Sequence, residues 1–168
     1  YRQGMVSILE YMEVSSPEEA RKYYEKALKL SQAICGAHRE TLTKSALTYL
    51  AEAYRLKGDR GDPEKALECL ENALELSKNT GDKWYEADIL RKIGFLRLKL
   101  GKNKALECMK KSLYLSQIYN YKEIEANALA AIGNFYTGVG KNDEAFHYFY
   151  RALKVSQKIG FTSFRARV

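Results

Sequence analysis

The sequence predicts an all-α protein, a right-handed superhelix (solenoid) of stacked helix hairpins, and two observations support this fold class. A pair of small residues seven positions apart recurs along the 168-residue chain, at 20/27, 66/73, 105/112 and 145/152. Successive copies are 46, 39 and 40 residues apart. A fixed period in this range is typical of a solenoid, in which each unit packs on its neighbours. Such a fold predicts an interaction scaffold rather than an enzyme.

Each repeat has the pattern of two helices joined by a short turn. Most apolar residues recur every three or four positions through both halves of one repeat, as a single helical face requires: Ile89, Ile93, Leu96 and Leu100, then Leu106, Met109, Leu113 and Leu115. Gly101 and Gly140 follow the expected first helices, where glycine supplies a left-handed cap. Asp62-Pro63 predicts an acidic N-cap with Pro at the first helical position, and Ser16-Pro17-Glu18-Glu19 predicts a capping box.

Small residues explain how closely the two helices of a repeat can approach. Gly94 and Gly133 occupy equivalent positions on the first helices. Ala105 and Ala145 occupy equivalent positions on the second helices. We therefore expect tight helix contacts at these positions, with aromatic side chains such as Phe149 filling the space between the turns.

These residues carry a resemblance to a known family. Ile132-Gly-Asn-Phe-Tyr136, Gly140, Glu144-Ala145, Phe149 and Ala152-Leu153 resemble the tetratricopeptide repeat, in its long form of about 40 residues rather than 34. The resemblance covers nearly the whole chain. It is weaker in the repeat that contains Gly94, which has Arg97 at the aromatic position, Ser112 at the last small position and one residue missing before Ala105. A Leu-Ser-Gln/Lys tract at 30–32, 76–78 and 115–117 extends the second helices, with Val155-Ser-Gln157 as a variant.

The repeat defines a single array over residues 1–168. Its units are expected at roughly 1–37, 38–80, 81–120 and 121–160, followed by the start of a further helix at 161–168. This last expectation rests on Gly160-Phe-Thr-Ser-Phe-Arg-Ala166, which aligns with Gly81-Asp-Lys-Trp-Tyr-Glu-Ala87. We interpret the chain as a piece of a longer protein, whose number of repeats the sequence does not give.

Several classes of function lack their sequence signals. No apolar run is long enough to cross a membrane. The three cysteines, Cys35, Cys69 and Cys108, lack paired spacing, which indicates reduced thiols and a cytoplasmic protein. Only two histidines occur, and no metal, phosphate-loop or nucleophile motif is present. We therefore expect no enzymatic activity, no catalytic residues, no cofactor, no bound metal and no membrane partner.

The resemblance implies that the first helices line a concave face that binds an extended or helical peptide. Counting from the small residue of each repeat, the groove-facing residues that we single out are Arg55, Arg91, Phe95, Lys99, Asn127 and Asn134. An Asn amide can donate and accept hydrogen bonds with a peptide backbone, and Arg can bind a carboxylate in bidentate fashion. Phe95, with Leu98, could seat an apolar anchor.

The net charge of +7 is concentrated in one repeat. Residues 91–111 contain eight basic residues against the single Glu107. Such a block predicts an acidic protein or peptide partner through electrostatic attraction. One alternative is an effector-sensing or regulatory segment of a larger transcription or signalling protein. A third hypothesis is nucleic-acid binding through the block 91–111, and self-association through the exposed last helix is a further alternative.

Overall fold

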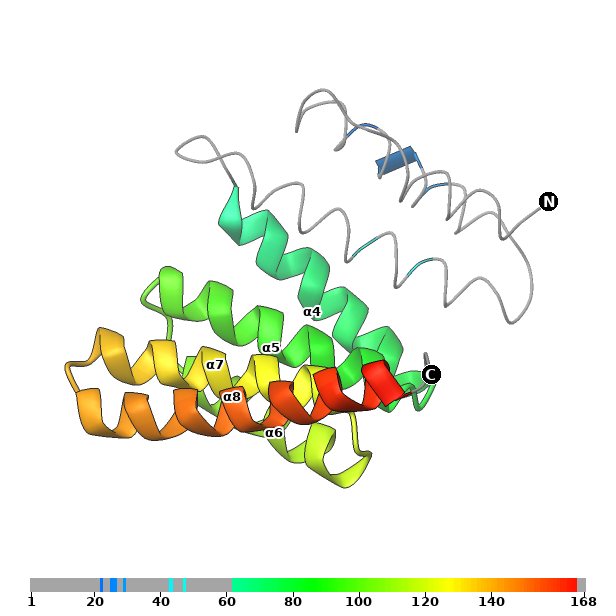
Figure 1. Ribbon diagram of the computed structural model, residues 1–168. Coiled ribbons are helices and arrows are strands. Elements are labelled where there is room, and N and C mark those ends of the chain that lie inside the picture. Colours follow the sequence, from blue (N-terminus) through cyan, green and yellow to red (C-terminus); the bar gives the residue numbers. More distant parts are fainter. Residues whose placement is uncertain are drawn as a thin grey trace. The chain divides into compact units, whose positions relative to one another are not determined.

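The computed structural model describes residues 62–165, with side chains to residue 160, and six isolated earlier positions: Lys22, Glu25, Lys26, Lys29, Thr43 and Leu47 (Figure 1). Arg55, Cys35, the Ser16–Glu19 capping box and the first pair of small residues therefore lie outside the described residues. The chain forms two compact units, residues 1–80 and 81–168, and each is considered by itself.

The described part of the chain contains five α-helices and no strand, which confirms the all-α prediction. Helix α4 (Pro63–Asn79) belongs to the first unit. The second unit contains α5 (Lys83–Lys99), α6 (Ala105–Ile118), α7 (Lys122–Gly138) and α8 (Asn142–Arg165). Among these described residues, no helix is long and apolar enough to cross a membrane.

Helix α4 begins as the sequence predicts. The Asp62 side chain accepts a hydrogen bond of 3.0 Å from the backbone N–H of Lys65, and Pro63 is the first helical residue. The ammonium group of Lys65 lies 3.0 Å from the same carboxylate. This cap satisfies one of the backbone donors that a helix start leaves without an intrahelical acceptor.

The second unit consists of two helix hairpins, α5–α6 and α7–α8, and α6 also packs against α7 (Figure 1). Gly101 and Gly140 adopt positive φ angles of 61° and 75° in the two turns, as expected for left-handed caps. Helix α8 begins three residues before Ala145, whereas α6 begins at Ala105 itself. The residue missing before Ala105 thus shortens α6, and Lys104 takes a left-handed conformation with φ of 67°.

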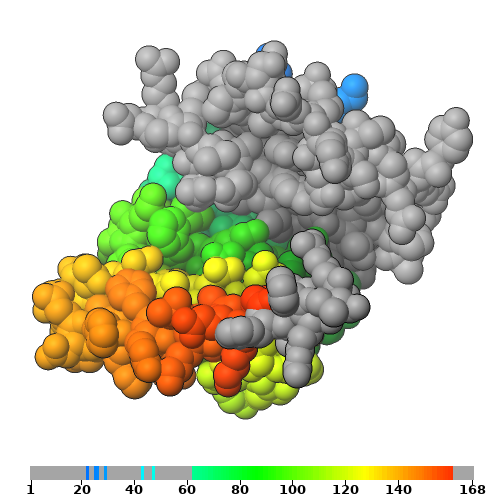
Figure 2. Space-filling view, viewed as in Figure 1, coloured from blue at the N-terminus to red at the C-terminus, as the bar shows by residue number. Residues whose placement is uncertain are grey.

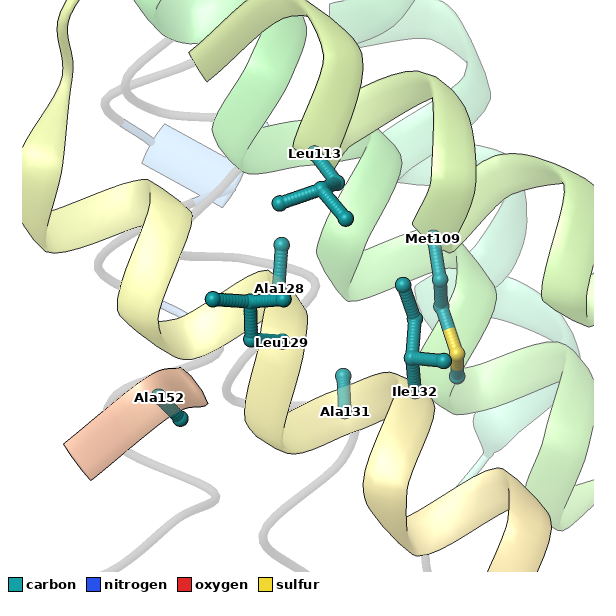
Figure 3. Close-up of a cluster of buried hydrophobic side chains, with 7 residues drawn as sticks. All are labelled: Met109, Leu113, Ala128, Leu129, Ala131, Ile132 and Ala152. Atoms are coloured by element: carbon teal, nitrogen blue, oxygen red, sulfur yellow. The ribbon is translucent and has the colours of Figure 1, made fainter. Parts of the chain in front are cut away.

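A cluster of buried side chains joins three helices of this unit (Figure 3). Met109 and Leu113 come from α6, and Ala152 comes from α8. Helix α7 lies between them and supplies four residues: Ala128, Leu129, Ala131 and Ile132. Because α7 contributes to both contacts, each hairpin buries its apolar surface on the next, as a solenoid requires.

The predicted close approaches occur at Gly94 and Gly133. A Cβ atom added at Gly94 would lie 2.7 Å from Cγ of Met109 and 3.0 Å from the carbonyl oxygen of Ala105. A Cβ atom added at Gly133 would lie 2.7 Å from the ring of Phe149. Both distances are too short for a real contact, so a side chain at either position would displace its neighbour.

The hydroxyls of three buried serines donate hydrogen bonds to backbone carbonyls. Ser77 and Ser116, both from the Leu-Ser-Gln/Lys tract, donate to carbonyls of their own helices at 2.8 Å. Ser112 donates across the hairpin to the carbonyl of Ala87, at 2.6 Å. The serine that weakens the resemblance of this repeat is therefore accommodated by a hydrogen bond between α6 and α5, because a buried hydroxyl needs a partner.

Helix α8 differs from the expected helix boundary near residue 160. It continues through Gly160 to Arg165 without a turn. Gly81 and Asn120, which end the preceding second helices, have φ angles of 69° and 58°, whereas Gly160 is not in this region. Glycine permits a left-handed turn but does not impose one.

Candidate functional site

Three of the predicted groove residues lie in one row along α5. Arg91, Phe95 and Lys99 are each four positions apart, a spacing that places side chains on the same face of a helix. The Lys99 ammonium lies over the Phe95 ring, 4.9 Å from its centroid. Arg91 and Phe95 are half-buried, and Lys99 is exposed. The row therefore offers an aromatic surface between two cationic groups.

Arg91 is held by a carboxylate, Asp88, whose pairing with it the sequence prediction did not include. Its Nη2 atom lies 2.6 Å from Oδ1 of Asp88, and Lys92 Nζ lies 2.9 Å from Oδ2 of the same group. Burial acts to raise the pKa of Asp88, but Lys92 and Arg91 outweigh it, so this pKa lies below its ordinary value. Asp88 is thus a counter-ion shared by Arg91 and Lys92, and the three groups together carry one net positive charge.

The Asp88 contact does not use all of the Arg91 guanidinium. Among the described residues, the Nε–H of Arg91 is the one buried side-chain donor or acceptor without a hydrogen-bond partner. A buried donor that lacks an acceptor costs free energy, about 1–3 kcal/mol. Arg91 is therefore oriented by Asp88, and its side chain remains 24% exposed.

The other two described groove residues lie on α7. Asn127 and Asn134 are seven positions apart, which is two turns, and both are exposed. Helix α7 contacts α5, so the amides and the α5 row occur on neighbouring helices of one unit. Arg55 lies outside the described residues. Leu98 packs against the buried cluster at Met109, which argues against its use as an anchor for a ligand.

The basic block at residues 91–111 is partly neutralised within the chain. Arg91 and Lys92 share Asp88, and Lys111 pairs with Glu107 at 2.8 Å. A hydrogen bond from Lys111 is the main cause of a lowered Glu107 pKa, to which Lys104 and Arg97 also contribute. The remaining exposed positive charge gathers around the α5–α6 turn, on Lys99, Lys102, Lys104 and Lys110.

The sequence pattern contained the signal for these ion pairs. Asp88 precedes Arg91 by three residues and Lys92 by four, and Glu107 precedes Lys111 by four. This order of acidic and basic residues favours ion pairs on one helix. Counting charges over the block left out Asp88, which lies just outside its limits, and did not pair Glu107 with Lys111.

Comparisons with known proteins identify the same repeat. Sequence models of the tetratricopeptide repeat match residues 9–34, 46–83 and 126–159, which together make up more than half of the chain. The repeat at 84–125, where the resemblance is weaker, lies between two matches. A search of curated proteins found no match.

Solved structures show the same fold at low sequence identity. MamA is 22% identical with a TM-score of 0.64, and the alignment covers 94% of this chain and 80% of MamA. Aspartyl phosphate phosphatase F from Bacillus subtilis is 18% identical, with a TM-score of 0.76 and coverage of 94% and 39%. A signal transduction ATPase with a tetratricopeptide repeat sensor from Pyrococcus horikoshii is 20% identical, with a TM-score of 0.74 and coverage of 96% and 24%.

The chain spans less than half of the phosphatase and about a quarter of the ATPase, so these likenesses concern the repeat fold alone. The repeat matches and the helix hairpins agree with each other, and they support a role as a protein–protein interaction scaffold. The chain belongs to the tetratricopeptide repeat family.

Proposed function

We propose that the chain is a non-enzymatic scaffold that binds an acidic peptide or protein segment on the face formed by α5 and α7. The observation that carries this proposal is the row of Arg91, Phe95 and Lys99 on α5, together with the exposed amides of Asn127 and Asn134 on α7, a helix that contacts α5.

Each group has a distinct role in this proposal. Asp88 positions Arg91, and the solvent-exposed part of the Arg91 side chain would donate to a carboxylate of the ligand. Phe95 would contact an apolar side chain of the ligand, and Lys99 would attract a second acidic group. The two Asn amides would pair with the ligand backbone. Because helices hold these groups in place, less conformational freedom is lost on binding.

The test is selection from a displayed library of short random peptides, followed by affinity measurements on the enriched peptides. We expect acidic peptides with one apolar residue. The site variant combines Arg91→Gln with Lys99→Glu, because a Glu at 91 would repel the neighbouring Asp88. This variant should bind the selected peptides at least tenfold more weakly, and its binding should depend less on salt.

The matched control is Lys104→Glu with Lys110→Glu, which changes exposed charges near the α5–α6 turn and leaves the α5 row intact. Unchanged affinity in this control and loss in the site variant would support the α5–α7 face. Equal loss in both variants, together with capture of nuclease-sensitive nucleic acid at low salt, would favour the basic block as a nucleic-acid site. Unchanged affinity in the site variant would refute the assignment.

A second candidate function is a sensor segment of a larger signalling protein. The observation that favours it is the likeness to a signal transduction ATPase described as having a tetratricopeptide repeat sensor, of which the chain spans about a quarter. A nucleotide-binding or DNA-binding domain encoded next to this segment in its gene would support this candidate. In that case the α5–α7 face would bind an effector or a neighbouring domain.

A further inference from the structure

Trp84 extends the α5 row by two turns. It is the second residue of α5, and steps of seven and four residues lead from it to Arg91 and then to Phe95. At 3.6 residues per turn, both of these residues lie within about 20° of Trp84 around the helix axis. Trp84 is 44% exposed, and its ring makes an edge contact with the ring of Tyr85, with centroids 5.2 Å apart. The largest aromatic side chain of α5 is thus open to solvent and in line with the proposed binding residues.

The repeat does not require an aromatic residue at this position. Glu123 lies 39 residues later, at the equivalent position of α7, and is exposed. The next residue of each helix has the packing role, since Ile124 of α7 is 3% exposed and Tyr85 of α5 is half-buried. Both α6 and α7 contact α5. Trp84 therefore belongs to a face of α5 that these two helices leave open.

The positive charges of this face run along α5 rather than from one helix to the next. On α7, Ala130 and Gly138 occupy the positions equivalent to Arg91 and Lys99, so the charges are not repeated there. Figure 2 shows atoms of α5, in green, and of α7, in yellow, at the same surface of the second unit. A ligand that uses all of the charged and aromatic groups therefore lies along α5.

The spacing of these groups distinguishes a helical ligand from an extended one. At 1.5 Å per residue, Arg91 lies about 10 Å from Trp84 along the axis, and Phe95 and Lys99 follow at steps of about 6 Å. Same-face residues of an extended strand recur about every 6.6 Å, which fits the shorter steps but not the longer one. A helix has the same rise as α5, so its residues at intervals of seven, four and four can meet all four groups from one face.

We propose that the ligand of the α5–α7 face is an acidic amphipathic helix that lies along α5 and covers Trp84 with an apolar side chain. Counted from the Trp84 end, in either chain direction, its residues at intervals of seven, four and four are apolar, acidic, apolar and acidic. Trp84 thus adds a second apolar contact to the one at Phe95. This inference rests on the proposed function, because it names the conformation of the same ligand. A helix laid into a groove is a recurring mode of peptide recognition.

The probes are two 20-residue peptides of alanine and glutamine that carry this pattern of two leucines and two glutamates, one peptide for each chain direction. Fluorescence anisotropy of labelled copies measures affinity. One of the two should bind at least tenfold more tightly than its own version with a central proline, which breaks the helix. Moving the glutamates by two residues, to the opposite face, should weaken binding to the same degree. Because Trp84 is the single tryptophan of the chain, unlabelled peptide should shift its emission to shorter wavelength.

Trp84→Ala should weaken binding of the helical peptide at least tenfold, since tryptophan is prominent among residues whose truncation weakens binding most. Trp84→Phe should recover part of this loss. Tyr114→Ala is the matched control, because Tyr114 is 64% exposed but lies on α6, and this variant should bind normally. Both side chains are exposed, so each variant should keep its helical circular dichroism.

Two outcomes separate this inference from the proposed function. If Arg91→Gln with Lys99→Glu abolishes binding of the selected short acidic peptides, while neither helical peptide binds more tightly than its proline version or Trp84→Ala has no effect, the inference fails alone. If Arg91→Gln with Lys99→Glu leaves the binding of every peptide unchanged, the α5–α7 face is wrong and the inference fails with it.

Discussion

We expect the Gly94→Ala substitution to destabilise the fold, because it adds a methyl group at a close helix contact. The new Cβ would lie 2.7 Å from Cγ of the fully buried Met109, 3.0 Å from the Ala105 carbonyl oxygen and 3.3 Å from the Met109 backbone nitrogen. Two of these three neighbours are backbone atoms of α6, which cannot move unless the hairpin shifts. Overpacking of this kind costs about 1–3 kcal/mol, and replacing Gly by Ala in a helix returns up to about 1 kcal/mol.

The expected net loss is therefore about 1 kcal/mol, which corresponds to a decrease in Tm of roughly 2–4 °C for a chain of this size. Urea unfolding followed by far-ultraviolet circular dichroism measures the loss. The fluorescence of Trp84, the single tryptophan, reports separately on α5, the helix that contains Gly94. Both probes should shift to lower urea concentration.

Gly138 provides the control for helix propensity, since a Cβ added there meets nothing within 4 Å and its φ is not positive. Gly138→Ala should be neutral or stabilising by up to about 1 kcal/mol. Gly133→Ala should lie between the two, because its clash is with the Phe149 ring, which is partly exposed and can move outward. If Gly94→Ala were as stable as Gly138→Ala, the close contact of α5 with α6 would not be a real constraint.

Two further substitutions and one chemical modification test other features of the described residues. Ser112→Ala should cost about 1 kcal/mol or less in urea unfolding, because it removes one hydrogen bond but leaves the Ala87 carbonyl its own helical partner. Asp88→Asn should lower stability at neutral pH and flatten the acid side of the stability profile. The folded-state pKa of Asp88 is lowered, so the contribution of this carboxylate to stability is complete above its ordinary pKa, near pH 4. That contribution is lost as the pH falls below this value. Burial, with Glu68 and Glu25, raises the pKa of the Cys69 thiol to about 11, so alkylation at pH 8, followed by peptide mass spectrometry, should be at least tenfold slower at Cys69 than in an unfolded control.

The sequence predicted the helices well because the repeat constrains them at every level. The Asp62 cap, the turn glycines and the small residues at 94 and 133 each leave a local signal, and these signals agree with the overall period. The length of α6 and the continuation of α8 through Gly160 were not predictable in the same way. Both depend on which of its permitted backbone conformations a single residue adopts.

The alignment of three candidate site residues along one helix was predictable, but their charge environment was not. A helical face follows from spacing alone, so Arg91, Phe95 and Lys99 could be placed on one row of α5. The state of each charge depends instead on rotamers and burial, which decide that Asp88 holds both Arg91 and Lys92. The same limit on prediction applies to the apolar residue Leu98. Whether its side chain packs in the core or faces solvent depends on how closely α5 and α6 pack against α7.

The repeated Lys-x-x-Glu pattern shows how charges can serve the array itself. Lys83 pairs with Glu86 at the start of α5, and Lys122 pairs with Glu125 at the start of α7, 39 residues later. Both glutamates are buried, and Glu125 also accepts a hydrogen bond from Gln117 of α6. A buried carboxylate requires such partners, so these lysines are committed to the fold. Among the lysines of α5 and α7, functional charge is therefore best sought at exposed residues without a carboxylate at helical spacing. That criterion separates Lys99 from Lys83 and Lys122, and it makes Lys99→Glu the most informative single change on the proposed face.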